Sequence, residues 1–186
     1  MGAGVLLVSG LMSGCSAPWS SPEPTMQVGQ AVKRVDAVLD ETFRAVQPRL
    51  KWREGPAAMS EQRNSVSNTA NGVVTVGRTR YVRTEVSKDK LARLAKAVEK
   101  HWKGEGYEIG DMNPKGPSFS GTASDGCRIT FSVGGSGIVY FDAGISAVSP
   151  GHGGEIKGEE GDEFAQDPQG GGPDHRPDVR DPYWSK

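Results

Sequence analysis

The feature that most constrains the fold of this 186-residue chain is a stretch of alternating apolar and polar residues over 127–147. Turn-forming residues precede it at 124–126 and interrupt it at 134–137. Alternation with a period of two predicts strands with one buried face, and tight turns between them predict an antiparallel meander. Because the Gly-rich turn 134–137 joins strand to strand, it predicts a hairpin and not a phosphate cradle, which would precede a helix.

Two amphipathic segments provide helices that can cover the apolar face of such a sheet. Apolar residues fall at helical spacing in 26–47, which ends at Pro48, and in 88–103, which ends at Gly104. Residues 107–112 and 118–123 predict two further short strands. We therefore predict an α+β fold, with an antiparallel sheet of about four to six strands and two amphipathic helices packed on one face.

The segment between the two predicted helices is read as a loop followed by a strand. Residues 57–70 are rich in Ser, Asn and Ala, which favours a loop, whereas 72–86 alternates as a strand does. Arg78, Arg80 and Arg83 form a basic cluster in this strand. Binding of a phosphate or carboxylate is one interpretation of the cluster. A solvated sheet face or edge is the favoured one, because charges discourage edge pairing.

The N-terminus resembles the signal and lipobox of a bacterial lipoprotein. A short apolar run over 5–12 leads to Ser13 and Gly14, and Cys15 follows them directly. A secretory signal has an apolar stretch of roughly 7–15 residues and small residues before the cleavage site, although its usual basic start is missing here. The run is too short for a transmembrane helix, which takes about 20 apolar residues.

Cys15 is therefore the predicted lipidation site, whose thiol sulfur takes a diacylglycerol after removal of a signal peptide at 1–14. Two or three acyl chains anchor a protein firmly, since each buried CH₂ adds about 0.8 kcal/mol. Residues 15–25 combine the lipidated Cys with a Ser/Pro-rich tether, which is a stiff and extended composition. The alternative to lipidation is a buried apolar N-terminal segment in which Cys15 has no special role.

Charge divides the rest of the chain into two parts. Residues 27–150 hold 18 Lys/Arg and 13 Asp/Glu, a net +5, whereas 151–186 hold 4 and 9, a net −5. Residues 26–149 form the predicted α+β domain. Residues 150–186 are acidic, rich in Gly and Pro and poor in large apolar residues, which predicts a disordered tail. Docking of the aromatic Tyr183 and Trp184 on the domain is the alternative.

No residue pattern in the chain predicts catalysis, a metal site or a cofactor. Cys127 is expected to be a buried small hydrophobe, because no marked His or Asp partner accompanies it. His101 stands alone without a second ligand at useful spacing. We therefore expect no catalytic residues, no metal ligands, no cofactor and no enzymatic activity.

Several short motifs together resemble the small uncharacterised lipoproteins of actinobacteria, especially the streptomycete type. The residues that carry the resemblance are the box 11–15, Trp52 with Gly55, the run 80–84 before a Ser87-capped helix, His101-Trp102 before Gly106-Tyr107, and Asp125-Gly126. Such relatives carry one Cys in the loop before the basic strand and another after the last strand. Because 57–71 and 143–150 contain no Cys, that disulfide is not expected here. The resemblance implies a surface-anchored α+β domain.

These observations predict a lipoprotein on the outer face of the cytoplasmic membrane that acts as a binding or interaction module. Its expected contacts are the membrane, through the lipid anchor, and either an envelope protein or an anionic polymer. Export and the lack of interleaved aromatic and basic residues disfavour nucleic acid. The alternatives are an accessory subunit or spacer of a cell-envelope complex and, less favoured, an envelope hydrolase.

Overall fold

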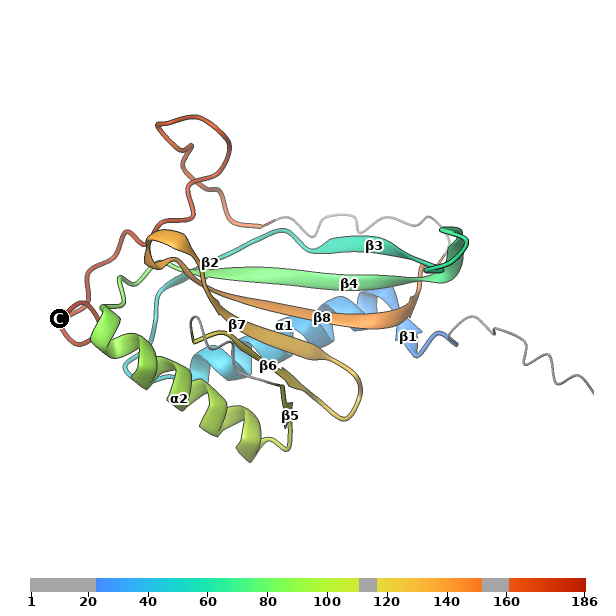
Figure 1. Ribbon diagram of the computed structural model, residues 1–186, viewed down its shortest axis with the longest axis horizontal. Helices are drawn as coiled ribbons and strands as arrows, with labels where there is room; N and C mark the ends of the chain where they lie inside the picture. The colour runs from blue at the N-terminus through green and yellow to red at the C-terminus, as the bar shows by residue number, and fades with distance from the viewer. Residues whose placement is uncertain (1–22, 111–116, 152–160) are drawn as a thin grey trace, which may run out of the picture.

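The computed structural model describes residues 23–110, 117–151 and 161–186 of the chain. Within these ranges two helices, α1 (Val28–Ala45) and α2 (Lys88–Gly104), accompany one eight-stranded sheet (Figure 1). The predicted α+β class is confirmed, and the sheet has more strands than predicted. Neither helix is both long enough and apolar enough to cross a membrane. The signal segment 1–14 and Cys15 lie outside the described residues.

The sheet is built around two long central strands. Its strands are β1 (Met26–Gln27), β2 (Trp52–Glu54), β3 (Ala58–Arg63), β4 (Ala70–Val82), β5 (Glu108–Ile109), β6 (Phe119–Thr122), β7 (Arg128–Val133) and β8 (Val139–Ser149). Their order is β2-β4-β8-β7-β6-β5, with β3 also on β4 and β1 on β8. Every pair is antiparallel except β1 with β8. A three-residue 3-10 turn, Gly135–Gly137, joins β7 to β8, as a hairpin connection requires.

One face of the sheet carries the core, and both helices pack on it. Cross-strand pairing places Phe119 opposite Phe131, and Phe131 opposite Phe141. Phe43 of α1 meets the ring of Phe141 at 4.9 Å between centroids, and Trp102 of α2 meets Phe119 at 5.1 Å. The indole N–H of Trp102 also donates a hydrogen bond to the hydroxyl of Thr42 in α1 (3.0 Å). The helices and the meander therefore share one continuous aromatic core.

The segment predicted as a loop over 57–70 contains the edge strand β3. This strand pairs with β4 from Ala58 opposite Gly77, and its register shifts between Glu61 and Arg63. Strand β4 begins at Ala70, two residues before the predicted start. Exposed side chains along β3 hide its strand character in the sequence, because the ladder to β4 and not a buried face holds it in place.

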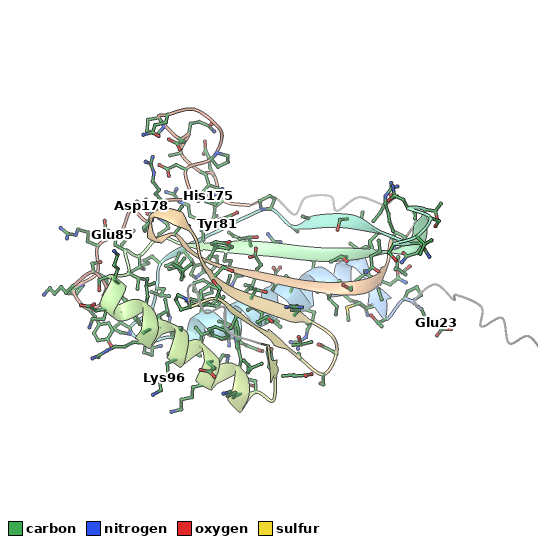
Figure 2. The ribbon with its side chains drawn as sticks, viewed as in Figure 1. Glu23, Tyr81, Glu85, Lys96, His175 and Asp178 are labelled. Atoms are coloured by element: carbon green, nitrogen blue, oxygen red, sulfur yellow. The ribbon has the colours of Figure 1, made fainter. Side chains whose placement is uncertain are left out.

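The acidic C-terminal segment also differs from its prediction of disorder. Residues 152–160 lie outside the described residues, but 161–186 contact β2 and β4 and reach the start of α2, with one loop that projects away from the sheet (Figure 1). His175 stacks on Tyr81 of β4 at 3.9 Å between ring centroids, and Phe164 meets both rings edge-on. The carboxylate of Asp178 accepts two hydrogen bonds from Arg83, each 2.8 Å long. Figure 2 shows His175 beside Tyr81, with Asp178 close by.

The last residues of the chain complete the core. Trp184 is 2% exposed, and its indole N–H donates to the carbonyl of Pro48 (2.8 Å). Ser87 is the N-cap residue of α2, as predicted, but its hydroxyl donates to the carbonyl of Lys186 and not to the helix, and its backbone N–H donates to the carbonyl of Trp184. Docking of the terminal aromatic residues, the less favoured interpretation of the sequence, is thus the observed one. A few apolar side chains of this segment are enough for docking, because the folded domain provides a preformed site for them.

Candidate functional site

The structure places the two residues considered for chemistry in unreactive surroundings. Cys127 is fully buried, and burial raises the pKa of its thiol to about 11, so the thiol stays protonated at neutral pH. His101 lies in the last turn of α2, with its Nδ1 3.9 Å from the nearest carboxylate oxygen of Glu105. Among the described residues no group of three His, Cys, Asp or Glu side chains could hold a metal ion.

The basic cluster of β4 divides between the two faces of the sheet, which corrects the prediction that it is solvated. Arg78 and Arg80 are 6% and 3% exposed, because they share the face of the valines that pack under α1. Arg83 lies on the opposite face, where it binds Asp178 of the C-terminal segment. Successive side chains of a strand point to opposite faces, so position along the strand decides which of the three arginines is buried. Their common charge does not predict this.

Carboxylates from two other elements neutralise the buried arginines. Nε of Arg78 lies 2.8 Å from a carboxylate oxygen of Asp36 and 3.1 Å from one of Glu54. Arg80 donates to Asp40 at 2.6 Å and to Glu54 at 3.3 Å. A buried charge is tolerated when it is paired and hydrogen-bonded in this way. The carboxylates that bind Arg78 and Arg80 thus come from this chain, and the ion pairs link α1 and β2 to β4.

A hollow with both charged and apolar side chains in its wall opens directly beside this cluster, where α1 ends and β2 begins. Its volume is about 250 Å³, and it is lined by Asp40, Phe43, Arg44, Arg49, Leu50 and Trp52. The guanidinium of Arg80 covers the ring of Trp52 at 4.0 Å from the centroid, which fixes the indole in the wall of the hollow. A wall of aromatic and aliphatic side chains with a few charged groups is typical of ligand sites.

The charged groups on the rim of this hollow are mostly positive. Arg44 and Arg49 are exposed, and neither forms an ion pair with a carboxylate in the described part of the chain. Asp40, the acidic residue of the rim, is already bound by Arg80. The guanidinium groups of Arg44 and Arg49 are therefore available to an anionic group of a ligand.

Helix α2 continues this positive charge. Its residues Arg93, Lys96 and Lys100 are exposed at helical spacing and make no ion pair with the described carboxylates, whereas Lys103 pairs with Glu99 at 2.6 Å. Figure 2 shows Lys96 on the side of α2 that faces away from the sheet. We call Arg44, Arg49, Arg93, Lys96 and Lys100 the basic surface.

A second hollow lies between the two helices that carry the basic surface. This shallow hollow of about 380 Å³ joins the end of α1 to α2, and it is lined by Ala45, Ala97, Lys100, His101, Gly104 and Glu105. The small residues Ala45 and Ala97 leave this space open between Arg44 on one helix and Lys100 on the other. A ligand that contacts the rim of the first hollow can therefore extend along α2.

The opposite face of the sheet carries a polar hollow that is a weaker candidate. It measures about 240 Å³ over the paired residues Gly77 and Gly144, with Asp142 and Arg128 in its walls. Burial raises the pKa of Asp142, whose carboxylate accepts a hydrogen bond from the hydroxyl of Thr79. Its one acidic and one basic side chain leave it without net charge, so no class of ligand is favoured there.

One feature of the sequence indicates the basic surface, although it was not among the features that predict a binding site above. Over residues 90–104 it has five Lys/Arg but a single carboxylate, Glu99, so most of these cations have no helical partner. The hollow itself could not be predicted, because its walls come from both sides of Pro48. Comparison of the chain with family models, with curated proteins and with solved structures finds no match.

Proposed function

We propose that this protein is a lipid-anchored binding module on the outer face of the cytoplasmic membrane. Anchoring is supported by the sequence alone, through the box 11–15 and the change in composition after Cys15. Binding is supported by one structural observation, the hollow beside Trp52 whose rim carries Arg44 and Arg49 without ion-pair partners among the described carboxylates. A ligand that joins negative charge to an uncharged group suits both parts of this site.

The alternative functions receive less support from the geometry. An envelope hydrolase needs a general base or nucleophile in its pocket, and the carboxylate that lines this hollow, Asp40, is held by Arg80 at 2.6 Å. An accessory subunit or spacer needs a surface for one dominant protein partner. Purification of the anchored protein with one stoichiometric partner, and no loss of that partner at high salt, would favour this alternative.

The anchor is tested by intact mass and detergent partitioning of the membrane-extracted protein. We expect the wild-type chain to begin at Cys15, to carry the mass of acyl chains and to enter the detergent phase. Cys15→Ser should lose both properties, whereas Cys127→Ala, the matched control at the other thiol, should keep them. A wild-type chain that is water-soluble and retains residues 1–14 would contradict the proposal.

A further inference from the structure

We propose that the basic surface binds a linear, phosphate-bearing polymer of the cell envelope. This inference rests on the proposed function, because it assumes an exported domain, and it names the class of ligand for the same site. Helix α2 has six Lys/Arg and two Asp/Glu, a net +4 along one element. Positive charge of this density raises the local concentration of polyanions and accelerates their association.

The distribution of ion pairs indicates that these cations serve an external ligand. Most other arginines of the domain already have acidic partners in this chain: Arg34 with Asp125, Arg53 and Arg83 with Asp178, and Arg78 and Arg80 with carboxylates of α1 and β2. In the described part of the C-terminal segment, Asp178 pairs with Arg53 and Arg83, and Asp167 and Asp174 pair with Arg176. The five residues of the basic surface make no such pair within the described ranges.

The extent of the surface favours a polymer over a single small anion. Arg93 and Lys100 lie seven residues apart on α2, which corresponds to about 10 Å of helix, and the surface continues from there to α1 and Arg49. One phosphate group reaches only one or two of these side chains. A chain of repeated phosphates follows the row, and its uncharged repeating groups can contact Trp52, which is partly exposed in the hollow.

The position of the tether favours an envelope polymer over the bilayer itself. Glu23 lies eight positions after Cys15, a reach of at most about 28 Å when fully extended. Figure 2 places Glu23 at one end of the long axis, with Lys96 toward the other end. A lipid anchor at Cys15 would therefore keep the β1 end of the domain within that distance of the membrane, and α2 can lie farther from it.

The test uses the full-length Cys15→Ser chain, which needs no detergent, with long-chain inorganic polyphosphate as the probe. Five contacts predict that log K falls with log salt with a slope of about −3.5, at about −0.7 per cation, or roughly a hundredfold between about 50 and 200 mM salt. A variant with Arg44, Arg49, Lys96 and Lys100 all replaced by Gln should bind at least about tenfold more weakly at low salt, with a slope near about −0.7.

A control variant with the same change in net charge separates the site from the overall charge. It replaces four exposed cations outside the basic surface by Gln: Lys33, Arg63, Arg128 and Arg176. We expect this control to keep the affinity and the salt slope of the parent chain within about threefold, because these side chains lie away from the surface. Equal losses in both variants would overturn the proposal, since net charge alone would then explain binding.

Vesicles distinguish the polymer from the membrane as the source of phosphate. Vesicles with and without phosphatidylglycerol, in an otherwise phosphatidylcholine bilayer, report the electrostatic part of membrane binding, because any insertion of the apolar run 5–12 is common to both. Preference for the anionic vesicles that disappears in the four-Gln variant, without polyphosphate binding, would overturn the inference in favour of the bilayer. Failure of lipidation at Cys15 with intact polyphosphate binding would instead refute the proposed anchor alone.

Discussion

Replacing Trp184 by alanine tests how much of the domain's stability comes from its C-terminal segment. The indole is 2% exposed and belongs to the same core as the buried residues of both helices. Its N–H donates to the carbonyl of Pro48 at 2.8 Å, while the Trp184 backbone carbonyl accepts a bond from Ser87 (2.9 Å). Alanine keeps the backbone bond and removes both the packing and the indole bond.

The expected loss follows from opposing contributions. Burial of an aromatic side chain removes roughly 150–250 Å² from water, equivalent to about 4–6 kcal/mol, and the indole hydrogen bond adds about 1 kcal/mol. Part of this gain is offset by the entropy of ordering a terminal segment. The segment can also detach without unfolding the sheet, so the loss cannot exceed the free energy of its docking. We expect about 3 kcal/mol, within the usual range for Trp→Ala in a core.

Urea unfolding followed by circular dichroism measures this loss, with thermal unfolding as a second readout. A loss of about 3 kcal/mol lowers the unfolding temperature of a chain this long by about 6–12 °C. Val66→Ala is the control, because Val66 is 79% exposed and its replacement should change stability by less than about 0.5 kcal/mol. If Trp184→Ala matched this control, the C-terminal segment would not be part of the core.

Two further predictions concern charged groups on the two faces of β4. Arg80→Ala should lower the free energy of unfolding by about 3 kcal/mol, because it removes a buried side chain together with its ion pairs to Asp40 and Glu54, and leaves Glu54 with Arg78 alone. Arg80→Met should cost less, since it keeps the aliphatic volume. The same urea assay measures both variants, and an equal loss would show that volume is unimportant. Burial lowers the pKa of His175 below 6.5, with Asp174 opposing the shift, so the docked segment binds its proton less readily than the free one. Docking of residues 161–186 should therefore weaken as pH falls through about 6.5 and stay constant above it, and proteolysis of this segment at several pH values measures the change. His175→Phe should remove this pH dependence. Equal protection of the segment at about pH 5.5 and 7.5 would contradict the reasoning.

The burial of Arg78 and Arg80 is a feature that the sequence does not predict. Their parity with the valines of the same strand favours the core face, whereas their charge favours solvent, and the sequence alone does not show which of the two decides. Asp36 and Asp40 decide the outcome, because they project from α1 toward this part of the sheet and neutralise the arginines. Such partners lie about 40 residues away in sequence, so only the packing of the helix reveals them.

Residue periodicity predicted the class of the fold correctly, whereas composition did not predict that residues 161–186 dock on the domain. The alternation over 127–147 and the helical stripes reflect burial of whole faces, which repeats along the chain and is therefore visible in it. Docking of residues 161–186 depends instead on Phe164, Tyr183 and Trp184, with polar residues between them. Their binding sites come from distant parts of the chain, such as Pro48 and Tyr81, and no local pattern announces them.

Mapping the ligand contacts by ¹H–¹⁵N NMR tests the central claim, that the basic surface is the binding site, most directly. Spectra of the full-length Cys15→Ser chain would be recorded with and without polyphosphate. We predict that the largest shift changes fall on residues 44–52 and 93–103, around the two hollows. Changes confined to residues 128–146, around Asp142 on the opposite face, or no changes at all, would contradict the account.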